Sequence, residues 1–286
     1  MPEVRADGNW RMVIGGRVFD TKNRHYIMGI LNVTPDSFSD GGKWDRLDDA
    51  LSFAGDMINE GADIIDVGGE STRPGYTAVT EQEELDRVVP VIEALRARFD
   101  IPVSVDTCKS AVARVALRAG ADMVNDITGL KGDPEMAGLI ASAEVPCCIM
   151  HNRATADYKD FIPELLDDLR LSADIALKAG ISADRMILDP GIGFGKTYEN
   201  NLEAINRLDK IADLGYPVLL GASRKSFIGK ALDLPVDERL EGTIAATVIG
   251  MLRGCTFFRV HDVRETKRAI IMTEAITGEI TGAITE

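Results

Sequence analysis

The sequence is poor in the residues that build metal and disulfide sites. Among its 286 residues are four cysteines and three histidines, and neither a CxxC pair nor an HExxH motif occurs. Structural zinc sites and disulfide frameworks depend on such spacings, so the sequence disfavours both. We expect buried, reduced thiols in a cytoplasmic protein; the cysteines are Cys108, Cys147, Cys148 and Cys255.

Positive charge is also scarce. The chain has 32 Lys and Arg against 46 Asp and Glu, which gives a formal net charge of −14 and a pI near 4.7. This balance argues against nonspecific nucleic-acid binding, which needs a basic face. No apolar run reaches the roughly 18 residues of a membrane-spanning helix. Residues 1–10 lack the apolar segment of a secretory signal, so we expect neither a signal nor a membrane span.

Two kinds of segment alternate along the chain. Segments with helical spacing of apolar residues, such as Leu47, Leu51, Ala54 and Ile58, separate short apolar runs that are typical of buried parallel strands. These runs occupy residues 26–31, 62–67, 101–105, 121–127, 146–150, 186–188, 217–220 and 255–260. The number and spacing of the units predict an α/β fold, a (β/α)8 TIM barrel of about 250 residues. A doubly wound open sheet has the same local texture and is the alternative.

The domain organisation follows from what surrounds these units. Residues 10–19 contain Gly15 and Gly16 between short apolar runs, which predicts a β-hairpin that closes the bottom of the barrel. No stretch rich in Pro, Gly or Ser divides the chain. We therefore expect a single domain over residues 1–286, with 1–25 as an N-terminal hairpin extension and 276–286 as a frayed tail.

Polar residues follow nearly every apolar run. In a barrel the carboxyl ends of the strands meet at one mouth, where active sites lie. One side of the predicted mouth offers amides and carboxylates, and the other offers cations. Asp and Ser also cap helices, so single members of the set have a structural alternative. The residues on the two sides are Asn32, Asp106, Asn125 and Asp189, and then Arg224, Lys225, Arg259 and His261.

The cationic side has the features of an anion site. Arg259 and His261 are two residues apart, so a strand points both side chains the same way. Ser226 would open a helix, whose N-terminus favours an anion. Loops after the seventh and eighth strands often bind phosphate in barrels. Lys225 has a second interpretation, a Schiff-base lysine, which rests on this one residue.

A glycine-rich segment over residues 191–197 is similar to a nucleotide-binding loop. Its spacing fails, because Pro190 stands where the first glycine belongs, and it follows a late strand. We interpret these glycines as allowing a close turn at the rim of the pocket.

Several longer motifs resemble those of the dihydropteroate synthase family. Residues 30–42 (ILNVTPDSFSDGG) resemble its first signature, and residues 66–75 (DVGGESTRPG) its second. Further matches, one at each strand end and in order, are SVDT (104–107), VNDI (124–127), LDPGIGFG (188–195), SRKSFIG (223–229) and RVHD (259–262). The resemblance covers roughly residues 26–275.

The resemblance implies a homodimeric TIM barrel of folate synthesis. Its reaction joins p-aminobenzoate to 6-hydroxymethyl-7,8-dihydropterin pyrophosphate and releases 7,8-dihydropteroate and pyrophosphate. It implies a pterin site of Asp106, Asn125, Asp189, Lys225, Met150 and Thr72. It implies a pyrophosphate site of Asn32, Arg259 and His261, with Mg²⁺ on Asn32, and a p-aminobenzoate site of Phe38, Thr72, Arg73, Pro74, Phe194 and Ser226. The implied catalytic residues are Lys225, Arg259, His261 and Asp40, with Asp40 a second ligand of the metal when its loop closes.

For the mechanism we expect a dissociative substitution. Pyrophosphate leaves first, the arylamine then attacks the pterin methylene, and the two signature loops close to exclude water. One departure is the segment MHNR at residues 150–153, which leaves the role of the fifth loop open.

Two rival functions remain. A methyltetrahydrofolate–corrinoid methyltransferase shares the pattern of Asp106, Asn125 and Asp189 but has no use for Arg259 and His261. A noncatalytic pterin-binding paralogue is the other.

Overall fold

The computed structural model describes residues 10–22, 24–34, 43–70 and 79–278. In this part of the chain eight parallel strands form one sheet in the order β8-β7-β6-β5-β4-β3-β10-β9. The edges meet where Leu188 pairs with Val218 and the Leu188 amide donates to the Pro217 carbonyl at 2.9 Å. The sheet is therefore a closed barrel, which confirms the predicted fold and excludes the open sheet. The strands are β3 (Tyr26–Asn32), β4 (Ile64–Gly68), β5 (Val103–Asp106), β6 (Met123–Asp126), β7 (Cys147–Met150), β8 (Met186–Asp189), β9 (Leu219–Leu220) and β10 (Phe257–Val260).

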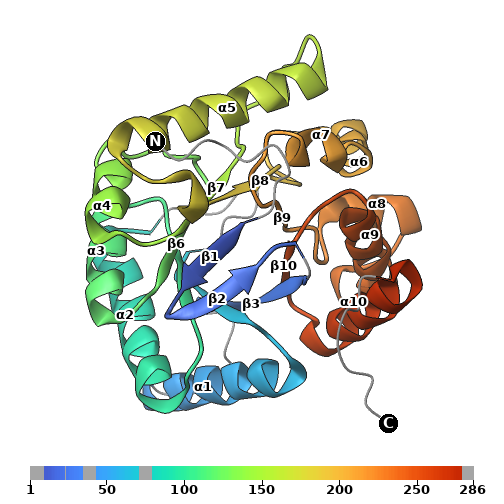
Figure 1. Ribbon diagram of the computed structural model, residues 1–286. Coiled ribbons are helices and arrows are strands. Elements are labelled where there is room, and N and C mark those ends of the chain that lie inside the picture. The colour runs from blue at the N-terminus through green and yellow to red at the C-terminus, as the bar shows by residue number, and fades with distance from the viewer. Residues whose placement is uncertain (1–9, 23, 35–42, 71–78, 279–286) are drawn as a thin grey trace.

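Helices surround the barrel (Figure 1). They are α1 (Lys43–Glu60), α2 (Glu81–Arg98), α3 (Ser110–Ala119), α4 (Met136–Ala143), α5 (Phe161–Ala179), α6 (Tyr198–Asn206), α7 (Leu208–Ala212), α8 (Ser226–Leu232), α9 (Leu240–Leu252) and α10 (Val263–Thr277). Single-turn 3-10 helices cover Ala183–Arg185 and Val236–Glu238. The expectation of one helix after each strand is wrong after β8 and β9, where two helices follow. After β9 the break is local, because Asp233 turns left-handed (φ +56°) and Pro235 cannot continue a helix.

The core has two layers, one inside the barrel and one between the barrel and its helices. Cys147 and Cys148 illustrate them, since adjacent residues of β7 point to opposite faces. Cys147 packs in the outer layer and Cys148 inside the barrel. All four cysteines are free thiols. Three of them are buried, as expected, whereas Cys108 is partly exposed.

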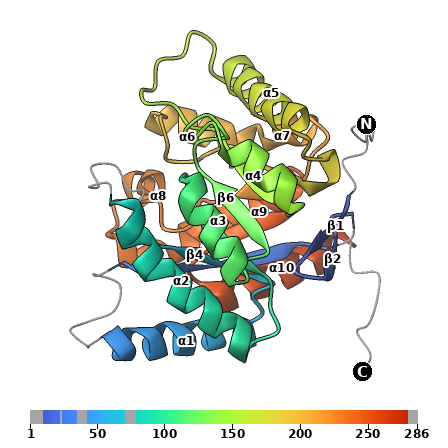
Figure 2. The ribbon, with the colours of Figure 1, turned by 90° about the vertical axis from the view of Figure 1, so that its left-hand side faces the viewer.

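An antiparallel hairpin of β1 (Arg11–Ile14) and β2 (Arg17–Asp20) covers the end of the barrel at which the strands begin (Figure 2). Successive side chains of a strand point to opposite faces, and one face of the hairpin places Met12, Ile14 and Phe19 in the inner core. The predicted hairpin is confirmed. At the other terminus Ile276 and Thr277 belong to α10, and residues 279–286 lie outside the described part of the chain. Among the described helices none is long and apolar enough to cross a membrane.

We expect Phe19→Ala to lower the free energy of unfolding by about 3–5 kcal/mol, as for other buried aromatic residues. Phe19 is 3% exposed, and its ring centroid lies 4.7 Å from that of Tyr26 and 6.0 Å from that of Phe257. Urea unfolding measures the change. The control is Val18→Ala on the same strand, where the side chain is 52% exposed and the effect should stay within about 0.5 kcal/mol. Equal losses in both variants would show that the hairpin does not seal the barrel.

Candidate active site at the mouth of the barrel

Strand register lines up part of the predicted site. Asn32 pairs with Gly68, Gly68 with Asp106, and Asp106 with Asn125, so four neighbouring strands present one row at their carboxyl ends. Gly68 has no side chain, and a Cβ there would lie 3.4 Å from Asn32 Oδ1 and 3.7 Å from Asp106 Oδ2. The row is therefore open between the amide and the carboxylate.

Arg259 crosses the mouth and joins two acids. Its Nε donates to Asp66 Oδ2 at 2.6 Å and its Nη2 to Asp106 Oδ2 at 2.7 Å. Asn125 Nδ2 donates to the same Asp66 oxygen at 3.1 Å. Burial acts to lower the pKa of Arg259, but the two carboxylates raise it above its ordinary value. Arg259 is thus held in place by buried carboxylates, and its charge is matched before any ligand arrives.

Asp66 also belongs to this group, although no role was predicted for it from the sequence. It lies inside an apolar run, within the second signature, and is fully buried. Its Oδ1 is buried and has no hydrogen-bond partner among the described residues. A carboxylate in the middle of an apolar strand was the signal that could have identified it, since such a group needs a partner.

Asp106 and Asp189 are both buried carboxyl groups. Burial raises the pKa of Asp106 to about 7, Arg259 acts to lower it, and Asp66 raises it further. Burial also raises the pKa of Asp189, against the lowering effect of Lys225. One Asp189 oxygen accepts the Gly191 amide at 2.7 Å. The pocket therefore offers one carboxyl group, that of Asp106, which can be neutral or charged close to neutral pH.

Lys225 links the acids to the turn after β8. Its ammonium donates to the Ile192 carbonyl and lies 4.6 Å from the ring centroid of Phe194. Burial lowers the pKa of Lys225 to about 8, and Asp189 counteracts part of this shift. Met150 is the register partner of Asp189 on β7 and is 3% exposed.

Fewer cations face the mouth than the sequence predicts, because Arg224 is paired within the protein. Arg224 is ion-paired with Asp262 across 2.9 Å (Nε to Oδ2), so it holds two loops together. His261 Nδ1 and Ser223 Oγ are 3.0 Å apart. Ser226 begins α8 and is exposed, as expected. The predicted residues Phe38, Asp40, Thr72, Arg73 and Pro74 lie outside the described part of the chain.

The donor set for a metal is small. Among the described residues no group of three or more His, Cys, Asp or Glu could hold a metal ion. Asn32 has an amide oxygen beside the open position at Gly68. A single such oxygen suits Mg²⁺, which keeps waters and substrate phosphates as its other ligands.

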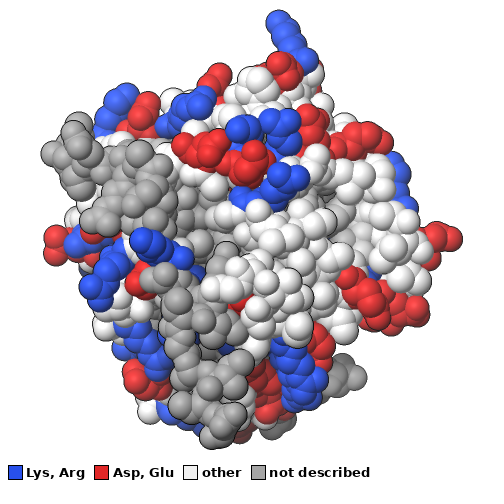
Figure 3. Space-filling model, turned by 45° about the vertical axis from the view of Figure 1, so that its right-hand side comes forward, with Lys and Arg blue, Asp and Glu red and all other residues white. Residues whose placement is uncertain are grey.

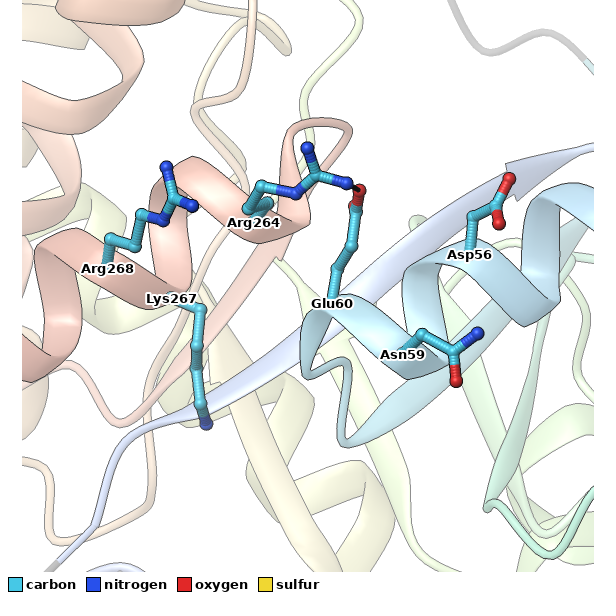
Figure 4. Close-up of a pocket in the computed structure, with 6 residues that line it drawn as sticks. All are labelled: Asp56, Asn59, Glu60, Arg264, Lys267 and Arg268. Atoms are coloured by element: carbon cyan, nitrogen blue, oxygen red, sulfur yellow. Dashed lines mark ion pairs between the residues drawn. The ribbon is translucent and has the colours of Figure 1, made fainter.

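A second hollow, of about 280 Å³, lies outside the barrel between α1 and α10 (Figure 4). Arg264 contacts Glu60 at 2.6 Å, and Lys267 lies 3.8 Å from Asp63. Two of its three cations thus lie near acids, and it contains none of the mouth residues. We therefore place the active site at the mouth.

The barrel and the buried polar residues at its mouth define the class, an α/β-barrel enzyme that binds a small polar ligand. The sequence profile of the family described as Pterin binding enzyme matches residues 28–261. The dihydropteroate synthase of Clostridium beijerinckii is 58% identical over 266 residues, which cover 93% of this chain and 99% of that protein.

Solved structures agree. The dihydropteroate synthase of Clostridium difficile, determined in the presence of pteroic acid, has 52% identity and a TM-score of 0.89 over 90% of this chain and 98% of that one. The dihydropteroate synthase of Xanthomonas albilineans with 4-aminobenzoic acid has 41% identity and a TM-score of 0.90 over 94% and 98%. This chain therefore belongs to the dihydropteroate synthase family of pterin-binding transferases, which confirms the resemblance seen in its motifs.

Proposed function

We propose that this protein condenses p-aminobenzoate with 6-hydroxymethyl-7,8-dihydropterin pyrophosphate to give 7,8-dihydropteroate and pyrophosphate. The observation that carries the proposal is the buried ring of acids, amide and cations at the mouth. Related structures were solved with pteroic acid and with 4-aminobenzoic acid, which correspond to a joined product and to one substrate.

The polar ring is suited to the edge of a pterin. That edge presents adjacent N–H donors, and Asp189 keeps one carboxylate oxygen beyond the one that accepts Gly191. Asn125 donates one of its two amide hydrogens to Asp66, and this hydrogen bond orients the amide whose Oδ1 we propose accepts from the ligand. We assign Asp106 and Lys225 to the same ring edge and Met150 to the ring face.

We assign the pyrophosphate to Asn32, Arg259 and His261. Mg²⁺ bound at Asn32 would neutralise negative charge on the pyrophosphate oxygens. Arg259, held by Asp66 and Asp106, needs no rearrangement to present its remaining guanidinium nitrogen. Such preorganised donors stabilise charge where it develops on a leaving group.

The chemistry we propose is dissociative. The bond between the pterin methylene and the pyrophosphate oxygen breaks first, and its electron pair leaves with the pyrophosphate. The arylamine nitrogen then attacks the cationic methylene, and its proton passes to the released pyrophosphate. Because the methylene is already a strong electrophile, no strong general base is required. Phe194 and Ser226 would hold p-aminobenzoate, together with Phe38, Thr72, Arg73 and Pro74 of the signature loops, which also carry Asp40.

The test is p-aminobenzoate-dependent release of pyrophosphate from the pterin pyrophosphate in the presence of Mg²⁺. We expect release only when both substrates are present. Methyl transfer from methyltetrahydrofolate to a corrinoid, with no release of pyrophosphate, would support the methyltransferase alternative. Binding of the pterin without turnover would support the noncatalytic one.

The pH dependence of kcat/KM should report on Lys225. The ammonium loses its charge as the pH rises through about 8, so its hydrogen bonds to the substrate weaken above that pH. We expect an alkaline fall of kcat/KM with a midpoint near this value. In Lys225→Arg the activity should be lower, and the component of the fall with its midpoint near 8 should be absent, because arginine stays charged. The same midpoint in both proteins would contradict the assignment.

We also propose that the protein is a homodimer, joined through an apolar face on α6, α8 and α9. A groove of about 240 Å³ lies there, lined by Leu202, Phe227, Leu232 and Ile249 among others. Figure 3 shows a broad area without charged side chains on this side of the molecule. Contiguous apolar surface of this kind marks interaction sites, and identical copies commonly pair about a twofold axis.

Sedimentation tests the dimer. We expect Ile249→Asp, at a side chain that is 42% exposed in the groove, to give monomers at concentrations where the wild type is dimeric. Ile271→Asp on α10 is the control, because Ile271 is 50% exposed outside the groove. Dissociation by the control alone would place the interface elsewhere.

We further propose that the protein works in the cytoplasm. Four unpaired thiols are suited to a reducing compartment, where they stay reduced.

A further inference from the structure

A chain of charged and polar side chains lies behind the mouth, between the loop after β7 and the turn after β8. At its centre Lys196 Nζ has three acceptors. These are His151 Nδ1 at 2.8 Å, the Gly191 carbonyl at 2.9 Å and the Phe194 carbonyl at 3.1 Å. An ammonium has three N–H donors, so the set uses each of them once. Nothing in the proposed reaction uses Lys196.

His151 continues the chain away from the turn. Its side chain is fully buried, and Nε2 lies 3.1 Å from Asp168 Oδ2. Because Nδ1 accepts from Lys196, the ring hydrogen belongs on Nε2, where it donates to Asp168. Burial and the neighbouring Lys196 lower the pKa of His151 to about 3, so the ring is neutral. Arg153 Nε donates to the same Asp168 oxygen at 2.6 Å and completes the chain.

The backbone of the turn after β8 lies in close contact with the backbone of the loop after β7. A Cβ on Gly191 would lie 1.9 Å from the His151 carbonyl oxygen, and one on Gly195 would lie 2.3 Å from that of Arg153. Both glycines have positive φ, +67° and +52°. The sequence places glycine at these points because the two loops touch backbone to backbone.

The same turn faces the active site. The Gly191 amide donates to Asp189, the Ile192 carbonyl accepts from Lys225, and the Phe194 ring lies against the Lys225 ammonium. A shift of the turn would therefore move both the pterin side and the p-aminobenzoate side of the pocket. Displacements of about 1 Å at such positions can cost a factor of about 100 in rate.

We propose that Lys196 and His151 are positioning residues that clamp the turn at residues 191–194 against the loop after β7, and so set where Lys225 and Phe194 meet the substrates. The substrates named rest on the proposed function. The proposal assigns a role to two segments that the reaction leaves unexplained. One is MHNR after β7, and the other is the segment that is similar to a phosphate-binding loop. The lysine of that segment is turned inward onto protein acceptors.

The test compares Lys196→Met with the matched control Lys159→Met, at an exposed lysine near the end of the loop after β7. Assays at pH 6 keep Lys196 charged, since burial lowers its pKa to about 7. We expect Lys196→Met to raise the KM for p-aminobenzoate at least tenfold, with a smaller change in kcat. Amide hydrogen exchange in the peptide over residues 190–197 should also become faster. Lys159→Met should match the wild type in all three.

Two further variants test the other members of this hydrogen-bonded group. His151→Gln keeps one hydrogen-bond acceptor and a donor on the side chain, as the neutral imidazole does, and its KM should stay close to that of the wild type. Asp168→Ala lies on a partly exposed helix position and should raise the KM about threefold even if Lys196→Met does not fold. A lower melting temperature with unchanged KM and unchanged exchange would overturn the clamp. An inactive wild type whose exchange still responds to Lys196→Met would instead overturn the proposed function and leave the clamp standing.

Discussion

Replacing Arg259 with alanine is expected to lower kcat/KM by a factor of about 100 to 1,000, the usual cost of one preorganised donor at a developing charge. The variant should also lose about 3–5 kcal/mol of the free energy of unfolding, because removing one partner leaves buried charges without compensation. Asp66 and Asp106 would lose their shared cation, and Asp66 Oδ1 already lacks a partner among the described residues. Pyrophosphate release and urea unfolding measure the two effects.

The stability loss should depend on pH with a definite sign. In the folded protein the pKa of Asp106 is already raised to about 7, and Arg259 acts to lower it. Without Arg259 the pKa of Asp106 rises further above its unfolded value, so the folded state binds more protons than the unfolded state. Stability of the variant then falls as pH rises, and its deficit should be larger at pH 8 than at pH 5.

Arg170→Ala is the matched control. Arg170 pairs with Asp167 at 2.8 Å on the surface of α5, with side chains 56% and 74% exposed. Such pairs contribute about 0–1 kcal/mol. If Arg259→Ala unfolded with the same midpoint as this control and kept its activity, Arg259 would be neither a structural hub nor a ligand of the leaving group.

The second large effect is expected for Gly191→Ala. The new methyl group would meet the His151 carbonyl oxygen at 1.9 Å, and the backbone has a left-handed φ of +67°. The conformational penalty of about 1–2 kcal/mol adds to an overpacking cost of about 1–3 kcal/mol. We expect a combined loss of about 2–5 kcal/mol in the free energy of unfolding. The displaced turn should lower kcat/KM at least tenfold, since the Gly191 amide no longer meets Asp189.

Gly138→Ala on α4 distinguishes this contact from a general intolerance of glycine substitution. No atom lies within 4 Å of the position that its Cβ would take. Alanine is favoured over glycine inside a helix by about 0.5–1 kcal/mol, so this variant should be as stable as the wild type or slightly more so. Similar stability of both variants would mean that the turn can move away from His151 without cost.

Arg259→Ala and Gly191→Ala act on different parts of one pocket. Arg259 holds the acids of β4 and β5 in place, and Gly191 lets the turn after β8 approach the loop after β7. The pocket is therefore held from two sides, by the ion pairs of Arg259 and by the contact between two loops at Gly191.

The amino-acid sequence by itself determined the barrel, its hairpin and the family. The spacing of apolar residues within a short segment indicates whether that segment forms a strand or a helix. Each element could therefore be recognised from its own residues. The polar residues that follow the apolar runs could also be recognised from the sequence. Asp106, Asn125 and Asp189 are where the parallel architecture brings the carboxyl ends together.

Only the tertiary structure decided how those polar groups are paired. Arg259 and Asp66 are 193 residues apart in sequence, and Lys196 and His151 are 45 apart. Whether such groups meet depends on strand register and on the tilt and closure of the barrel, which no local pattern encodes. For the same reason the sequence presented Arg224 as a cation of the mouth, whereas the fold pairs it with Asp262. The positions of the polar residues at the strand ends place them at one end of the barrel. Which of them pair with one another depends on how the sheet closes.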